Sequence, residues 1–162
     1  MRTQLAAATL AAALILPISA QGAETYTNAR FGFQFDVPDG FTAVQASSEN
    51  GDGQVFVTAD QRATLTLFGG NVTEPSFAAE VGQATQYARN TGWNITYEAG
   101  QNGWGVYSGL FTDQILYARM EAQCNDTQFA AVWLLFQVQD RPVFEPLTNE
   151  LAQRLKTNSD CK

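Results

Sequence analysis

The stretch Thr127-Gln-Phe-Ala-Ala-Val-Trp-Leu-Leu-Phe-Gln-Val138 decides the fold. Its residues fall into two alternating series, and both series are apolar: Phe129, Ala131, Trp133 and Leu135 form one, and Ala130, Val132, Leu134 and Phe136 form the other. Successive residues of a strand point to opposite faces of a sheet. A strand that is apolar on both faces is typical of the buried middle of a sheet. The stretch therefore predicts a central strand.

Other runs of alternating residues predict the strands around it. Residues 31–38 alternate aromatic with polar or small side chains and stop at Pro38-Asp-Gly40, which is typical of a strand followed by a turn. Residues 53–59 and 63–68 predict two more strands, and the short segment between them fits a hairpin. Further strands are expected at residues 94–99, 104–112 and 115–124.

Two segments have a period near 3.6 instead of two, which predicts amphipathic helices. The first follows Ser76, a suitable N-cap, and ends at Gly92; the second follows Pro142 and has Pro146 in its first turn. The apolar faces consist of Phe77, Val81, Ala84 and Ala88 in the first helix and of Phe144, Leu147, Leu151 and Leu155 in the second. Because the connections are short, we expect an α+β domain, a mainly antiparallel sheet with two helices packed on it.

The N-terminal residues predict a secretory signal. Arg2 precedes an uncharged run from residue 3 to residue 23 that has an apolar centre and ends in small residues. A membrane anchor is disfavoured because the run is rich in alanine, is interrupted by Pro17, and is followed by no basic residue before Arg30. Cleavage after Ala20 and after Ala23 fit equally well. We expect a signal peptide at residues 1–23, one domain at residues 24–162, and a periplasmic or secreted location.

The charge of the chain bears on its partners. The formal net charge is −7, and Lys156 and Lys162 are the only lysines. Nucleic acids and anionic lipids are bound by clustered Lys and Arg, so we expect no nucleic-acid partner and no stable membrane insertion once the signal is removed. The apolar fraction of 45% is typical of a globular domain.

Cys124 and Cys161 form an even pair in a chain that we expect to be exported. This is the usual setting for a structural disulfide. A redox-active pair is disfavoured, because such pairs are closely spaced and these two cysteines are not. Closing the loop between them should contribute about 3 to 4 kcal/mol to stability.

The sequence shows no catalytic constellation. It contains no histidine, which removes the commonest general base, the usual triads and most zinc sites, and it lacks nucleophile-elbow and phosphate-loop motifs. We therefore expect no cofactor and no enzymatic activity. One alternative is a hydrolase with an acid pair, because glycoside hydrolysis needs only two carboxyl groups across a cleft. The candidate acids are Glu98, Asp113, Glu121 and Asp126, and nothing in the sequence selects two of them.

A polar cluster at residues 49–53 could offer oxygen ligands to calcium from Glu49 and Asp52, aided by Asp60. It lacks the spaced ligands and terminal glutamate of an EF-hand. We interpret it as a loop whose Asn and Gly residues accept positive φ, and we predict no metal site.

Aromatic residues suggest where a partner binds. Trp93, Trp104 and Tyr107 flank the glycine-rich residues 100–105, which we expect to form a loop. Trp and Tyr are favoured anchors in binding sites, although they are also ordinary core residues. Together with Asp52 of the other predicted loop, these three residues are the candidate contacts for a ligand or partner.

A family resemblance supports this interpretation. The segments Tyr26-Thr-Asn-Ala-Arg-Phe-Gly-Phe33, Val37-Pro-Asp-Gly-Phe41 and Asn50-Gly-Asp-Gly53 resemble a family of small exported bacterial proteins, and the first two are similar to the opening of PsbP-like domains. The resemblance implies an α/β/α sandwich and an accessory or binding role. We therefore expect an exported, non-catalytic binding or accessory domain whose partner is a protein or a small molecule, with the hydrolase as the alternative.

Overall fold

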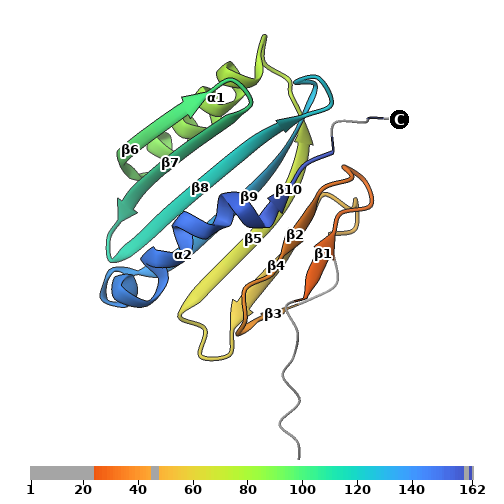
Figure 1. The fold of residues 1–162 in the computed structure, drawn as a ribbon. Coiled ribbons are helices and arrows are strands. Elements are labelled where there is room, and N and C mark those ends of the chain that lie inside the picture. Colours follow the sequence, from red (N-terminus) through yellow and green to blue (C-terminus); the bar gives the residue numbers. More distant parts are fainter. Residues whose placement is uncertain (1–23, 45–47, 159–160, 162) are drawn as a thin grey trace, which may run out of the picture.

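The computed structural model describes residues 24–44, 48–158 and 161, so the predicted signal peptide lies outside it. A seven-stranded sheet in the order β3-β4-β5-β9-β8-β7-β6 faces a smaller sheet in the order β1-β2-β10, and every strand pair is antiparallel (Figure 1). The elements are β1 (Thr25–Thr27), β2 (Gln34–Asp36), β3 (Phe41–Ala43), β4 (Gly53–Thr58), β5 (Ala63–Asn71), α1 (Phe77–Asn90), β6 (Asn94–Gln101), β7 (Trp104–Phe111), β8 (Gln114–Gln123), β9 (Gln128–Gln137), the 3-10 turn η1 (Val138–Asp140), α2 (Arg141–Arg154) and β10 (Leu155–Lys156).

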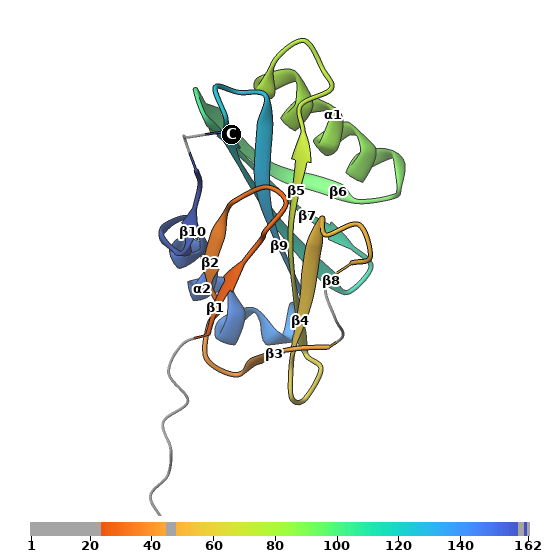
Figure 2. The ribbon, with the colours of Figure 1, turned by 90° about the vertical axis from the view of Figure 1, so that its right-hand side faces the viewer.

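Strand β9 is the central strand that its sequence predicts, lying between β5 and β8 in the middle of the seven. Its even-numbered series, which includes Val132 and Leu134, packs in a core with α2 and the small sheet. Its odd-numbered series, which includes Ala131 and Trp133, packs in a second core with α1. The two helices therefore cover opposite faces of the large sheet, as Figure 2 shows, and the expected α+β class is confirmed.

The small sheet corrects the predicted N-terminal strand. Only Gln34–Asp36 of residues 31–38 forms a ladder, in which Phe35 pairs with Tyr26 of β1 on one side and with Leu155 of β10 on the other. The short strands β1, β3 and β10 were not predicted. Each has at most three residues, too few for an alternating pattern to stand out.

The second helix also differs from the prediction at both ends. It begins at Arg141, so Pro142 lies at its start and Pro146 lies inside it, where the ring removes one backbone hydrogen bond. Leu155 does not belong to the helix, because its backbone is extended and joins β10. The apolar period continues through Leu155 because that side chain still enters the core next to α2.

Helix α1 begins and ends as its sequence predicts. The hydroxyl of Ser76 accepts a hydrogen bond from the amide of Ala79 at 3.2 Å, and Gly92 follows the helix with φ of 103°. The helix lies over β6 and β7. It comes close to β7 at Gly105, where an added Cβ would lie 2.5 Å from Cγ1 of Val81.

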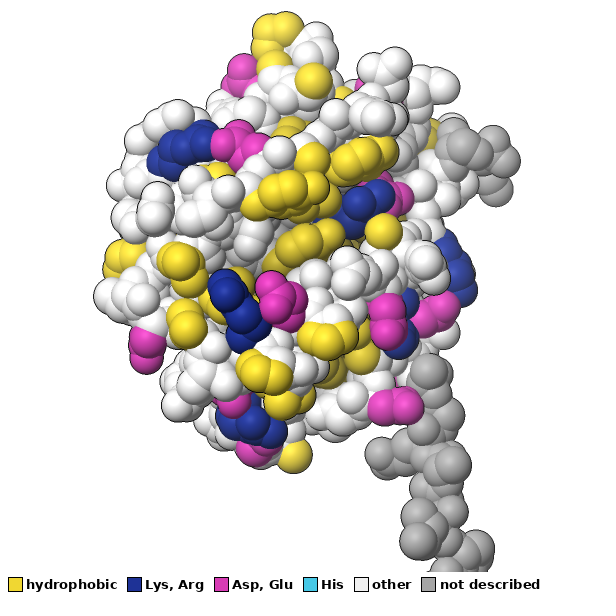
Figure 3. Space-filling view, turned by 60° about the vertical axis from the view of Figure 1, so that its left-hand side comes forward, with side chains coloured by type: hydrophobic (Ala, Val, Ile, Leu, Met, Phe, Trp, Pro, Cys, Tyr) yellow, Lys and Arg dark blue, Asp and Glu magenta, His cyan; other side chains and the backbone are white. Residues whose placement is uncertain are grey.

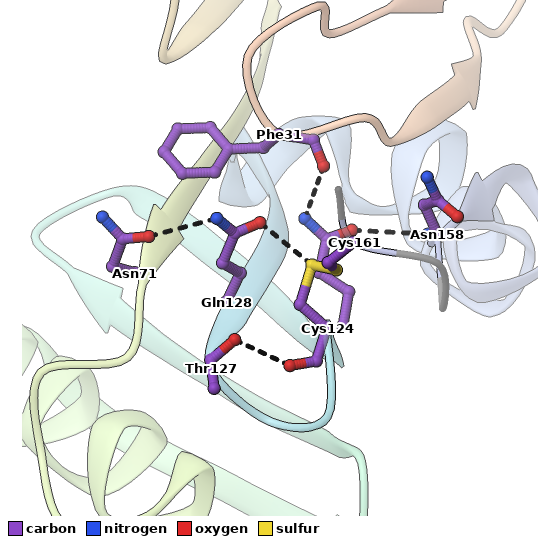
Figure 4. Close-up of a disulfide and its surroundings, with 8 residues drawn as sticks. Phe31, Asn71, Cys124, Thr127, Gln128, Asn158 and Cys161 are labelled. Atoms are coloured by element: carbon purple, nitrogen blue, oxygen red, sulfur yellow. Dashed lines mark hydrogen bonds between the residues drawn. A yellow bond between two sulfur atoms is a disulfide. The ribbon is translucent and has the colours of Figure 1, made fainter.

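The turn between β8 and β9 is joined to the C-terminal segment by a disulfide (Figure 4). Cys124 and Cys161 are bonded with their Cα atoms 5.1 Å apart, in agreement with the predicted pairing. Cys124, Asn125 and Asp126 have φ of 60°, 50° and 62°, which is uncommon for residues other than glycine. The disulfide therefore holds one end of a turn that has an unusual backbone.

Candidate binding site

A cavity of about 580 Å³ lies between the N-terminal half of α1 and the hairpin formed by β6 and β7. We call it the α1 cavity. Phe77, Val81 and Gly82 line it from the helix, Trp104 lines it from the hairpin, and Asp126 lines it from the β8–β9 turn. Its volume is in the range of sites that hold small organic ligands.

Glycines keep this cavity open and bring its walls close to each other. Gly82 lies on α1 with no other atom within 4 Å of the position that a Cβ would take. Gly105 lets α1 approach β7, since any side chain there would collide with Val81. The predicted glycine-rich loop at residues 100–105 is in fact the end of a hairpin: Gln101 pairs with Trp104, and only Asn102 and Gly103 form the turn. Gly103 makes that turn with φ of 89°.

A second concavity of about 430 Å³ lies on the opposite face of the same strands, beside α2. We call it the α2 groove. Tyr97, Trp104, Tyr117 and Arg119 line it from the sheet, and Asn149 lines it from the helix. Figure 3 views the molecule from the β6 side and shows hydrophobic side chains gathered in a band, with basic and acidic side chains beside them. Trp104 is among the lining residues of both concavities, and its ring lies on the α2 side, because the next residue of β7, Gly105, faces α1.

The polar groups of the α2 groove are held by one another. The guanidinium of Arg119 lies over the ring of Trp104, and its Nε donates a hydrogen bond to Oε1 of Glu121 at 2.8 Å. The side chains of Arg119 and Glu121 are only 15% and 17% exposed. Burial raises the pKa of the neighbouring Tyr117. This groove therefore offers a neutral, prearranged set of hydrogen-bonding groups around an aromatic wall.

Two of the three aromatic residues singled out from the sequence lie away from these concavities. Tyr107 is 1% exposed and packs in the core beneath α1, and its burial raises the pKa of its hydroxyl to about 12. Trp93 is half-buried with its ring 5.7 Å from that of Phe111. Tyr107 is thus a core residue that no partner reaches from outside, because its position on β7 turns it toward the helix. Trp104 alone lines a concavity.

Asp52 lies in a separate cluster at the start of β4. Its carboxylate pairs with Arg30 and accepts a hydrogen bond from Nδ2 of Asn50. Asp60 lies past the other end of β4, where hydrogen bonds from Thr58 and Arg62 lower its pKa to about 2. The two carboxylates therefore cannot share an ion, which corrects the idea that Asp60 aids residues 49–53. Within residues 24–44, 48–158 and 161, no three His, Cys, Asp or Glu side chains are grouped to hold a metal.

The four candidate acids are divided between different places. Glu98 and Asp126 both line the α1 cavity, and Glu98 is paired with Arg89 of the helix. Glu121 lies on the opposite face with Arg119. Asp113 belongs to the turn between β7 and β8, where its carbonyl accepts a hydrogen bond from the amide of Val138 at 2.7 Å.

Sequence reasoning missed Arg119 and Tyr117, which are two of the polar residues that the sheet gives to the α2 groove. A signal was present. In residues 115–124, Tyr117, Arg119 and Glu121 follow one another at every second position, which places them on one face of a strand. A basic and an acidic residue on the same face of a strand, together with an aromatic one, indicate a polar site rather than a core.

The fold defined by these elements is PsbP-like. No family model matches the chain, and no curated protein matches its sequence. Among solved structures it is similar to the cyanobacterial PsbP protein CyanoP from Synechocystis sp. PCC 6803, with a TM-score of 0.58 and 14% identity over 88% of this chain and 96% of that one. It is also similar to a point mutant of the protein Mog1, with a TM-score of 0.56 and 8% identity over 83% and 95% of the two chains.

No helix in the described part of the chain is long and apolar enough to cross a membrane.

Proposed function

We propose that this protein is an exported, non-catalytic binding domain and that the α1 cavity is its binding site. The observation that carries the proposal is the cavity itself, which has a volume of about 580 Å³ and is lined by Phe77, Val81 and glycines beside a few polar side chains. Sites for small ligands are typically concave and mostly apolar, with a few polar groups that fix orientation.

The glycines of the site support this assignment. A helix loses stability where it contains glycine, by about 1 kcal/mol relative to alanine. Gly82 has room for a side chain, so packing does not explain why it is glycine. A requirement for open space beside α1 would explain it.

Binding is tested with the protein purified after export and labelled with ¹⁵N. A library of small organic fragments should shift the amide signals of Gly82, Gly100 and Gly103 in a saturable manner. The variant Gly82→Leu fills the cavity from α1 and should abolish the shifts of Gly100 and Gly103. Gln86→Leu places the same side chain on an exposed part of α1 outside the cavity and should leave them unchanged. If no fragment shifts the cavity glycines, the α1 cavity is not a binding site.

Export has its own test. Mass spectrometry of the native protein should find an N-terminus at Gln21 or at Glu24, with residues 1–20 or 1–23 absent. An intact N-terminus on a membrane-embedded species would contradict the export proposal and leave the binding proposal standing.

One observation favours a second candidate, an acid-pair hydrolase. Of the four candidate acids, Glu98 and Asp126 line the same cavity. The purified protein is offered 4-nitrophenyl glycosides, and any hydrolysis should disappear in both Glu98→Gln and Asp126→Asn. Activity that survives either change would rule out this pair.

A further inference from the structure

The α1 cavity has two chemically different parts. The buried residues Phe77, Thr85 and Val106 line its inner side. The hydroxyl of Thr85 donates a hydrogen bond to the carbonyl of Val81 at 2.8 Å, so its donor is already used within the helix. The inner side therefore suits an apolar body, which would be removed from water on binding.

The outer side of the cavity carries acidic side chains. Glu98 and Asp126 are exposed, and none of the described residues that line the cavity is Lys or Arg. Glu98 is neutralised by Arg89, whereas Asp126 has no basic partner among the described residues. One carboxylate charge is thus available at the entrance, in a chain whose net charge is −7. A ligand anion would be repelled and a cation attracted.

The backbone of Asp126 is held in place by its turn before any ligand arrives. It is the last of the three residues with positive φ, and Thr127 closes the turn through its amide and hydroxyl, which donate to the carbonyl of Cys124 at 3.1 and 2.7 Å. Cys124 is fixed in turn by its disulfide to Cys161. A charged residue whose backbone is already ordered loses only side-chain freedom on binding, which favours recognition by position.

From these features we infer the class of ligand: a small organic cation in which one primary ammonium group is joined to an aromatic or aliphatic body. The body occupies the inner side of the cavity next to Val81, and the ammonium group pairs with Asp126. Trp104 also contributes to the lining of the cavity, at the end of the β6–β7 hairpin. This inference rests on the proposed binding function and adds the ligand's charge and shape.

Three probes of nearly equal shape test it. They are 2-phenylethylamine, 2-phenylethanol and phenylacetate, which carry a positive charge, no charge and a negative charge. Each is titrated into the ¹⁵N-labelled protein, and affinity is read from the amides of Gly82, Gly100 and Gly103, with Gly40 as a reference outside the cavity. We expect the amine to bind about fivefold more tightly than the alcohol, since Asp126 is exposed, and phenylacetate to bind least.

Two variants separate charge from shape. Asp126→Asn removes the charge, and because Asn also accepts positive φ the turn is retained; it should bring the amine to the affinity of the alcohol. Gly82→Leu should weaken all three probes, and Gln86→Leu should weaken none. Raising NaCl to 0.5 M should reduce the advantage of the amine in the unaltered protein, which gives a measurement independent of any variant.

The outcomes are distinct. The inference of a cationic ligand is overturned if the amine and the alcohol bind with equal affinity. It is also overturned if the tighter binding of the amine persists in Asp126→Asn or in 0.5 M NaCl. Either result leaves the proposed binding site in place. Failure of all three probes to shift the cavity glycines also overturns the inference of a cationic ligand. The proposed function falls only if the wider fragment library leaves those glycines unshifted as well.

Discussion

The guanidinium of Arg119 lies over the indole ring of Trp104, with its Cζ atom 5.0 Å from the ring centroid. The two residues come from neighbouring strands, β8 and β7, and each lines the α2 groove. Trp104 also lines the α1 cavity. A single cation–π contact therefore joins two residues of the α2 groove, one of which also contributes to the lining of the α1 cavity.

Replacing Arg119 with lysine should weaken its contact with Trp104. Lysine cannot stack its charge as a plane on the indole or keep the same hydrogen bond to Glu121. We expect Arg119→Lys to lower the free energy of unfolding by about 1 kcal/mol, measured by urea denaturation. Arg141→Lys serves as the control, because Arg141 is half-exposed and lies 3.8 Å from its partner Glu145; it should change stability by less than about 0.5 kcal/mol. If Arg119→Lys and Arg141→Lys lower the free energy of unfolding equally, the cation–π contact does not stabilise the fold beyond an ordinary surface ion pair.

Adding one methyl group to Gly105 or to Gly82 should have opposite effects. Gly105→Ala places a Cβ 2.5 Å from Val81, so α1 has to move away from β7 at a cost of about 1 to 3 kcal/mol. Gly82→Ala meets open space and should stabilise the helix by about 0.5 to 1 kcal/mol. Thermal unfolding should show a lower midpoint temperature for Gly105→Ala and a higher one for Gly82→Ala. Val81→Ala should relieve part of the cost of Gly105→Ala, and additivity of these two changes would contradict the proposed contact.

Removing the disulfide should destabilise the domain without abolishing its folding. The double change Cys124→Ser and Cys161→Ser should lower the free energy of unfolding by about 3 to 4 kcal/mol, because the loop between them is no longer closed in the unfolded chain. The transition should remain cooperative, since the two hydrophobic cores are unchanged. Urea denaturation at matched protein concentration measures the difference. Loss of cooperativity would show that the disulfide organises more of the fold than its own turn.

Stability should fall in alkaline solution because of Tyr107. Burial raises the pKa of its hydroxyl from 10.0 to about 12, so the folded state prefers the neutral form. This contribution is fully present below about pH 10 and is lost between about pH 10 and about pH 12, where the unfolded chain ionises first. The free energy of unfolding, measured across this pH range, should decline less steeply in Tyr107→Phe than in the unaltered protein. Tyr87→Phe is the control, because Tyr87 is 66% exposed, and it should not change how the free energy of unfolding declines with pH.

Local patterns in the sequence predicted most of the fold. The two apolar series of residues 127–138 identified β9, and Ser76 and Gly92 marked the ends of α1, because both signals depend on the periodicity of a single element. Leu155 was assigned to the wrong element for the same reason. Its spacing continues the period of α2, whereas its backbone follows its pairing with Phe35, more than a hundred residues away.

The site could be predicted only in part. Trp104, which lines both concavities, was singled out because its residue type and its glycine neighbours are visible in the sequence. Tyr107 looked equivalent, but the face of β7 on which it lies points to the core. The α1 cavity itself was beyond prediction, because it depends on how closely the helix approaches β7, and that distance is set by the contact of Gly105 with Val81.

The small sheet joins two segments that are far apart in the sequence, residues 25–36 and 155–156. Strand β2 receives β10 along one edge, so Phe35 of the first segment pairs with Leu155 of the last. Phe33 and Phe35 are fully buried in the finished domain. During synthesis this edge of β2 therefore stays unpaired until residues 155–156 have been made. A product that stops before β10 would leave that edge open and lack Leu155 in the core.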